Sequence, residues 1–404
     1  MAEPEPDRVA TRVGEHIVLP GMVSAHSHAF QRGLRGRTQR GGRGTFWSWR
    51  GLMYRFANGI DPDSIYALSR HAYAELALHG VTHVGEFHYV HHQPDGTPYA
   101  DRIAMADAVI RAARDVGIRI TLLRVLYERA GWGRAIEDGQ RRFCDGADDA
   151  IRDADALESR WADDACVNVG LAPHSVRAVS ADSLKALARE ASRREWPLHI
   201  HVGEQRREVQ ECLAEHGCRP VELLAEQGVL SERFVGVHAT HLSPSEISLL
   251  AERWVCVCRT TERDLGDGSP DLAALRARSA RFCVGVDSHA RSDPFEELRA
   301  LELDERVRTE ARNAFANGTE LLRWGSDPTP LGTARSTDAI ELDAHDPTLA
   351  GSDDDTLDDA IAFGAGGRTV RQVVVDGKPV VDGGVLPDRD AIRVAFDHAV
   401  RELA

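Results

Sequence analysis

The chain reads Leu19-Pro20-Gly21-Met22-Val23-Ser24-Ala25-His26-Ser27-His28-Ala29-Phe30-Gln31 where an apolar, strand-like run passes through Pro-Gly and ends in two histidines. Along a β-strand, residues i and i+2 point to the same side, so His26 and His28 would face the same way. Two imidazoles on one face can hold a metal ion between them. Two solvated histidines in a small-residue loop would look the same, so the other ligands must come from elsewhere in the chain.

Composition excludes several classes of protein. The chain has 404 residues, 42% of them hydrophobic, and a formal charge of −15, which argues against nucleic-acid or anionic-membrane partners. The first 12 residues are acidic and Pro-rich, unlike a signal peptide, and no run approaches the roughly 18 apolar residues of a membrane span. Seven cysteines do not form a secreted disulfide pattern, and we expect Cys256 and Cys258 to be buried thiols. These features predict a soluble cytoplasmic protein.

Short apolar runs alternate with amphipathic helical patterns along most of the chain. The expected strands are residues 17–24, 80–87, 118–126, 166–174, 197–202, 234–238, 254–258 and 282–287. The expected helices are residues 63–78, 103–116, 150–162, 181–193, 221–227, 243–253, 271–279 and 297–317. Eight such repeats predict an α/β fold, a closed (β/α)8 TIM-type barrel. A doubly wound open sheet is the alternative, but no G-x-G-x-x-G turn follows the first strand.

The pattern changes after the last repeat. Short strand-like runs follow one another at residues 339–342, 372–375 and 379–381, with an Asp-Gly turn signal at Asp376-Gly377 between the last two. We therefore expect a small, β-sandwich-like module formed by both chain termini. The predicted division is residues 1–18 for an incomplete N-terminal part of that module, 19–332 for the barrel, and 333–404 for the rest of the module with a terminal helix.

Polar side chains mark the ends of most expected barrel strands. Reactive groups of such barrels lie at the carboxyl ends of the strands. Each histidine alone could simply be hydrogen-bonded there, but polar groups that converge on one barrel mouth must find partners. The residues at these ends are His26, His28, Glu86, His88, His174, His201, His238 and Asp287. Together they predict a shared metal site.

This arrangement resembles the amidohydrolase superfamily. The resemblance implies that His26, His28, His201 and Asp287 bind the catalytic metal. Binuclear members usually bridge two metals with a carboxylated lysine on the fourth strand, and no lysine ends that strand here; Lys185 lies in the following helix. The expected cofactor is therefore one divalent metal, Zn²⁺, which suits mixed imidazole and carboxylate ligands.

The spacing His201-x-x-Glu204 resembles the deaminase branch of that superfamily. The resemblance gives Glu204 a catalytic role as the acid that protonates the leaving nitrogen, with Asp287 as proton acceptor and His238 stabilising the tetrahedral centre. Ammonia leaves only when protonated, so an acid is needed at this position. An exposed first-turn glutamate is the alternative reading of Glu204.

Local segments resemble the formimidoylglutamate deiminase family in particular. These are HSHAFQR (26–32), FWSWR (46–50), EFHYVHH (86–92), PHSVRAV (173–179), TTE (260–262) and LGDG (265–268). The family's substrate, N-formimino-L-glutamate, is a small dicarboxylate that is hydrolysed to N-formyl-L-glutamate and ammonia in histidine degradation. Arg50 and Arg177 are the expected carboxylate partners, since arginine can grip a carboxylate with two parallel hydrogen bonds. Gln31, Tyr89 and His174 are the further expected substrate contacts. Arg50 on the surface and Arg177 as a helix-start residue are the alternatives.

Departures from the family pattern leave two other interpretations open. Arg259 stands where the family commonly has proline, and Arg263 and Asp264 are also unusual. Few residues precede the first barrel strand, and the segment 318–338 is short. The alternatives are a deaminase of a purine- or triazine-type heterocycle, and a metal-binding barrel without turnover. We expect a homodimer.

Overall fold

A ring of eight parallel strands forms the body of the protein. The computed structural model describes residues 8–39, 44–334 and 337–403. The strands are β3 (Met22–Ser27), β4 (Val81–His88), β5 (Arg119–Leu126), β6 (Val167–Pro173), β7 (Leu198–Val202), β8 (Phe234–His238), β9 (Trp254–Val257) and β10 (Arg281–Val284). They pair in sequence order, and a parallel bridge between Ser27 and Asp287 joins the last strand to the first. The predicted TIM-type barrel is confirmed.

The first predicted strand, residues 17–24, is wrong in its bounds. The chain breaks at Gly21 into β2 (His16–Pro20), which belongs to a second sheet, and β3 of the barrel. Pro20 has no amide hydrogen to continue the ladder. The Gly21 amide then donates to the carbonyl of Asp338 at 3.0 Å, and the Met22 amide donates to the carbonyl of Gly80 at 3.0 Å. One apolar run thus contributes one strand to each of the two sheets.

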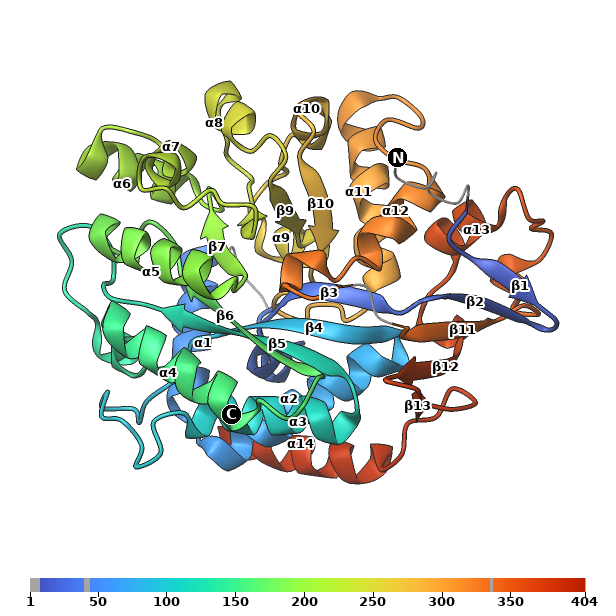
Figure 1. Ribbon diagram of the computed structural model, residues 1–404, viewed down its shortest axis with the longest axis horizontal. Coiled ribbons are helices and arrows are strands. Elements are labelled where there is room, and N and C mark those ends of the chain that lie inside the picture. The colour runs from blue at the N-terminus through green and yellow to red at the C-terminus, as the bar shows by residue number, and fades with distance from the viewer. Residues whose placement is uncertain (1–7, 40–43, 335–336, 404) are drawn as a thin grey trace.

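Helices surround the barrel strands (Figure 1). The longer ones are α1 (Phe46–Asn58), α2 (Pro62–Leu78), α3 (Ala104–Val116), α4 (Ala147–Arg160), α5 (Ala181–Arg194), α6 (Arg206–His216), α11 (Pro294–Thr309) and α14 (Arg389–Leu403). The shorter ones are α7 (Pro220–Glu226), α8 (Pro244–Leu249), α9 (Arg259–Leu265), α10 (Leu272–Ala277), α12 (Gly318–Gly325), α13 (Leu357–Gly364), η1 (Ala29–Leu34), η2 (Asp138–Phe143), η3 (Thr329–Leu331), η4 (Pro347–Leu349) and η5 (Gly367–Thr369). No described helix is both long and apolar enough to cross a bilayer.

The helix predictions fail mainly around the barrel mouth. The helix expected at residues 297–317 ends at Thr309, and the next helix, α12, begins only at Gly318. Helices α6 and α9 were not expected, although both carry residues that border the candidate site. α9 starts directly after β9, with Cys258 as its N-cap residue. Segments this short give weak periodicity, so their conformation depends on contacts made elsewhere in the fold.

Chain termini form a second, antiparallel sheet beside the barrel (Figure 1). Its strands pair in the order β1 (Thr11–Val13), β2, β11 (Ala339–Asp343), β12 (Val370–Val375) and β13 (Lys378–Val381). The predicted Asp-Gly hairpin is confirmed between β12 and β13. Asp376 and Gly377 have φ of +52° and +71°, as the two central residues of a type I′ turn require.

Apolar side chains and thiols fill the barrel interior. The buried cluster comprises Val23, Ala25, Val235, Val237, Trp254, Cys256, Cys258, Cys283 and Leu331. The prediction of buried thiols at Cys256 and Cys258 is confirmed, and no described cysteine forms a disulfide. This packed layer closes the barrel beneath the polar strand ends.

Candidate active site

Three imidazoles and one carboxylate converge at the carboxyl ends of the barrel strands. His26 Nε2 lies 3.1 Å from His201 Nε2 and 3.6 Å from Asp287 Oδ1, and His28 Nε2 lies 3.4 Å from the same oxygen. Each of the four residues is at most 6% exposed. Four buried donor atoms of this kind, so close together, fit a divalent metal with nitrogen and oxygen ligands. The structure therefore brings together the four predicted ligands.

The three histidines are held in the form that can donate a lone pair. Burial, with the neighbouring histidines, lowers the pKa of His28 to about 3 and the pKa of His26 and His201 well below the usual value. His28 Nδ1 lies 2.9 Å from the carbonyl oxygen of Phe87. Because that oxygen can only accept, Nδ1 donates the hydrogen and Nε2 is left free to act as a ligand.

Unusual backbone geometry places these side chains. His238, Ala239, Asp287 and His289 all have φ between +49° and +71°, a region that residues other than glycine rarely adopt. Such strain persists where surrounding structure holds it, and it clusters at functional sites. Gly285, two residues before Asp287, allows β3 to approach closely, since a Cβ at Gly285 would lie 2.6 Å from the Cβ of His26.

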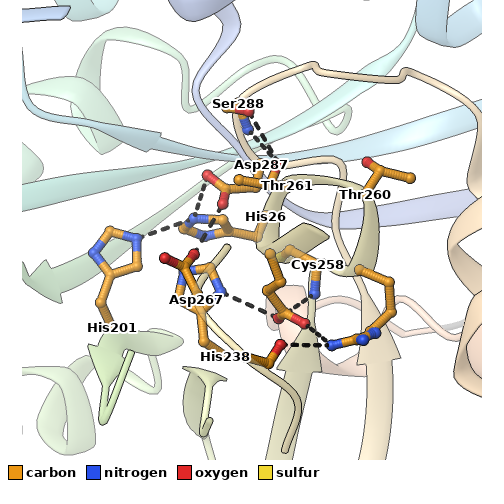
Figure 2. Close-up of polar contacts among 12 residues, drawn as sticks. His26, His201, His238, Cys258, Thr260, Thr261, Asp267, Asp287 and Ser288 are labelled. Carbon is orange, nitrogen blue, oxygen red and sulfur yellow. Dashed lines mark hydrogen bonds and ion pairs between the residues drawn. The ribbon is translucent and has the colours of Figure 1, made fainter. Parts of the chain in front are cut away.

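Proton-carrying groups lie beside the ligands. His238 Nε2 is 3.8 Å from Asp287 Oδ2, and its Nδ1 is 3.3 Å from Glu262 Oε1 (Figure 2). Burial raises the pKa of Glu204 to about 8, and it raises the pKa of Asp267 to about 7. Burial alone would lower the pKa of His238, but the carboxylates of Glu204, Glu262 and Asp287 raise it well above the usual value. Proton exchange at neutral pH is thus available next to the metal ligands. We call His26, His28, His201, His238 and Asp287 the floor of the pocket.

The opposite side of the pocket carries two arginines. The Arg50 guanidinium lies 4.6 Å from the ring centre of Trp47 and 5.3 Å from that of Tyr54, and its Nη1 is buried without a hydrogen-bond partner. Arg177 Nη1 donates to the Tyr127 hydroxyl at 3.4 Å. Within the described part of the chain, neither guanidinium forms an ion pair with a carboxylate. We call Arg50, Tyr54, Tyr127 and Arg177 the wall of the pocket.

Floor and wall line one shared cavity. Gln31 donates from Nε2 to the Tyr89 hydroxyl at 2.8 Å and leaves its own Oε1 buried without a partner. The His174 ring lies 4.8 Å from that of Tyr127. The predicted site residues that line this cavity are His28, Gln31, Arg50, Tyr89, His174, Arg177, His201, Glu204, His238 and Asp287. His26 lies fully buried at its base.

Sequence reasoning missed several neighbours of these residues. Tyr54 lies one helical turn after Arg50, a spacing that could have revealed it. Glu262 lies within a motif quoted for the resemblance, but no role was inferred for it. Gln140 donates to the hydroxyls of Tyr54 and Tyr127 at 3.2 and 2.8 Å, and nothing in its own segment indicates that contact. Gln140 thus holds the two tyrosines of the wall, and Glu262 contacts His238 of the floor.

Three further histidines, including His88 at the end of β4, lie away from the four candidate ligands. His91 Nε2 is 3.0 Å from the carbonyl oxygen of Val125, and His92 Nε2 is 3.0 Å from Asp145 Oδ1. His88 packs 5.2 Å from the ring of His91. They belong to a separate buried network around Arg124, which pairs with Asp145 and Asp153.

The fold and the site define a class of protein. The sequence model of the amidohydrolase family matches residues 17–326, and the chain belongs to that family, whose members hydrolyse C–N bonds. The formimidoylglutamate deiminase of Pseudomonas aeruginosa is 37% identical over 100% of this chain and 93% of its own. A 5-methylthioadenosine/S-adenosylhomocysteine deaminase of Halobacterium salinarum is 27% identical over 96% of this chain and 87% of its own. The crystal structure of an amidohydrolase from Brucella melitensis superimposes with a TM-score of 0.89 at 34% identity, covering 98% of this chain and 95% of that one.

Proposed function

We propose that the protein hydrolyses the formimino C–N bond of N-formimino-L-glutamate, giving N-formyl-L-glutamate and ammonia. The observation that carries the proposal is the pairing of three neutral histidines on the floor, His26, His28 and His201, with two arginines on the wall that have no carboxylate partner among the described residues. A dicarboxylate amidine needs both features in one cavity. The 37% identity to a formimidoylglutamate deiminase over the whole chain supports the same substrate.

One divalent metal, Zn²⁺, would be held by His26, His28, His201 and Asp287. Neutral imidazoles and a carboxylate are common zinc ligands. A hydrolysis involves no change of oxidation state, so the redox-inactive Zn²⁺ is sufficient. When bound, such an ion supplies a Lewis acid that lowers the pKa of water toward neutrality.

The chain's own groups would move the protons. Asp287 accepts a proton from the attacking water, and His238, 3.8 Å from that carboxylate, stabilises charge that develops as the formimino carbon becomes tetrahedral. Glu204, with its pKa raised to about 8, still carries a proton at neutral pH. It can therefore protonate the nitrogen that leaves as ammonia.

The wall would bind the two carboxylates of the substrate. Arg177 is buried and Arg50 is half-buried with its Nη1 shielded from solvent, so both offer charged donors. A charge-assisted hydrogen bond is strong where water is excluded. Gln31, Tyr89 and His174 line the cavity between the wall and the floor. Their amide, hydroxyl and imidazole groups are suited to orient the amidine over Glu204.

We also propose that the enzyme acts in histidine degradation in the cytoplasm as a homodimer. The pathway follows from the proposed substrate. The net charge of −15 argues against nucleic acid as a binding partner. The domain division expected from the sequence, residues 1–18, 19–332 and 333–404, is kept as a proposal with its first boundary moved to Gly21, where the chain passes from β2 to β3; residues 1–7 lie outside the described part of the chain. Light scattering during gel filtration would give the mass in solution, and a monomer would contradict the dimer.

The proposal is tested by ammonia release from a panel of substrates. Zinc-loaded enzyme should release ammonia from N-formimino-L-glutamate and not from an adenosine-type purine or an aminotriazine. Release from a heterocycle alone would favour the alternative of a heterocycle deaminase. Bound zinc without ammonia from any of them would favour a barrel without turnover.

A further inference from the structure

Arg259 occupies the buried space between the barrel floor and the outer helices. It is 4% exposed and opens α9 directly after β9. Its Nη1 donates to Glu262 Oε2 at 2.6 Å and to the carbonyl oxygen of Gly268 at 3.4 Å, while its Nε donates to Asp304 Oδ2 at 2.7 Å. One side chain therefore connects its own helix with the loop that follows it and with α11.

Glu262 is the link between this arginine and the floor. Its carboxylate is fully buried, and Oε1 accepts from the Cys258 amide at 3.0 Å and lies 3.3 Å from His238 Nδ1 (Figure 2). The other oxygen faces Arg259. A carboxylate this deeply buried is costly unless a cation and hydrogen bonds accompany it, and Arg259 supplies that cation.

The contact with Glu262 determines how His238 is presented. Because the carboxylate accepts a hydrogen from Nδ1, the ring is fixed with Nε2 toward Asp287 and the cavity. If Glu262 moved, the ring would lose that restraint. The Gly268 carbonyl gives Arg259 a second contact with the site, since the preceding residue, Asp267, interacts electrostatically with His238.

We propose that Arg259 is a positioning residue, which acts through Glu262 to orient His238 and through Gly268 to fix the loop that carries Asp267. This inference rests on the proposed function only in assigning His238 a part in the reaction. It also gives a role to a residue at which the sequence departs from the family it resembles. The segment in which Arg259 replaces the family's proline then contributes to the geometry of the site.

Arg263 provides a matched control one turn further along α9. It pairs with the same Asp304 but is 42% exposed, and its described contacts do not include Glu262. Substitution of Arg263 removes an arginine from the same helix and the same ion pair. Any effect that passes through Glu262 should therefore be absent.

The test compares zinc-loaded wild type with Arg259→Met, Arg259→Lys and Arg263→Met, measuring kcat, KM, zinc content and melting temperature. Arg259→Met should lower kcat roughly 10- to 100-fold, as loss of a supporting hydrogen bond to a site histidine does. KM and zinc content should not change, since the restraint acts in the transition state. Arg259→Lys should recover part of kcat, because lysine keeps the cation but cannot form all three contacts. Arg263→Met should match wild type.

A double-mutant cycle with Glu262→Gln tests whether Arg259 acts on His238 through Glu262. If Arg259 acts through Glu262, the double variant Arg259→Met/Glu262→Gln should be no slower than the slower single variant, so the losses should not multiply. Wild-type kcat in Arg259→Met, an equal loss in Arg263→Met, or multiplied losses would each overturn the proposal. Arg259→Lys no better than Arg259→Met would show a merely structural role. Should Arg259→Met fail to fold, Arg259→Lys and its pair with Glu262→Gln give the same cycle.

A structural measurement separates this inference from the proposed function. If wild type releases no ammonia from N-formimino-L-glutamate, the proposed function fails. The crystal structure of Arg259→Met then still decides the inference. A rotated His238 ring that has lost its contact with Glu262 would support it, and an unchanged ring would overturn it.

Discussion

On the floor of the pocket, burial keeps the side chains of His26, His28 and His201 neutral, whereas the wall presents two guanidinium groups, those of Arg50 and Arg177. The reason lies in the side chains themselves. An imidazole ordinarily titrates near neutrality, so desolvation is enough to remove its proton. A guanidinium titrates so far above neutrality that it stays charged even in a buried site.

This contrast shows how one cavity can carry metal ligands and anion-binding groups a short distance apart. The floor stands on barrel strands whose backbone fixes each ligand. The wall is formed by α1 and by the segments that follow β5 and β6, and tyrosine hydroxyls and aromatic rings contact its cations in place of carboxylates. A carboxylate partner on the wall would compete with an anionic substrate.

The largest expected effect comes from removing a floor carboxylate. Asp287→Asn should lower turnover more than about 10⁴-fold, because it removes both a metal ligand and the proton acceptor. Zinc content, measured by mass spectrometry of the metal, should fall below one equivalent. Full zinc content with wild-type turnover would show that this side of the cavity is not the floor of a metal site.

Glu204→Gln separates proton transfer from metal binding. Glutamine cannot protonate the leaving nitrogen, so kcat should fall roughly 10²- to 10⁴-fold while zinc content stays at the wild-type level. Steady-state ammonia release with parallel metal analysis checks both statements. A loss of zinc in this variant would instead make Glu204 part of the ligand set.

Neutralising the wall should affect the substrate and spare the metal. Arg50→Met and Arg177→Met should each lower kcat/KM for N-formimino-L-glutamate roughly 10- to 100-fold, the effect of losing a charged hydrogen bond. The loss should shrink for an analogue that lacks one carboxylate. Arg207→Met is the control, since Arg207 stacks 4.7 Å from the Trp47 ring but does not line the cavity. Unchanged kinetics in both wall variants would contradict the dicarboxylate assignment.

The last expected effect is on stability and leaves the cavity lining intact. It concerns Glu208, which accepts from the Gly203 amide at 3.2 Å and interacts electrostatically with Arg177 and His238. Burial raises the pKa of Glu208 from 4.5 to about 7, so the folded state keeps a proton that the unfolded chain has released. This group therefore costs stability progressively as pH rises from about 4.5 to 7, by up to about 3 kcal/mol.

Glu208→Gln should remove that dependence, because the amide oxygen can still accept from Gly203 without becoming charged. Urea unfolding at pH 5 and pH 8 measures the free energy of unfolding of both proteins and hence its pH dependence. The variant should gain stability over wild type at pH 8 and gain much less at pH 5. An equal gain at both values would mean that Glu208 does not titrate in this range.

The barrel and most of the floor could be predicted because they follow from local pattern and one geometric rule. Strand period places His26 and His28 on one face, and parallel strands bring His201, His238 and Asp287 to the same mouth. Arg50 and Arg177 came from motif resemblance, and the structure places both in the cavity.

Other parts could not be predicted, because they depend on contacts between distant segments. The apolar run around Gly21 divides between two sheets only because Asp338 and Gly80 pair with its two sides. Gln140 reaches Tyr54 across more than 80 positions of the chain. The role of Arg259 appears only when α9 has placed it between Glu262 and Asp304.

The most direct test of the whole account is product analysis of N-formimino-L-glutamate incubated with the enzyme in ¹⁸O-labelled water, with and without a chelator. The account predicts equal amounts of ammonia and N-formyl-L-glutamate, one ¹⁸O atom in the formyl group, loss of both products on chelation and recovery when zinc is restored. Formation of glutamate and formamide, or turnover that a chelator leaves unchanged, would contradict it.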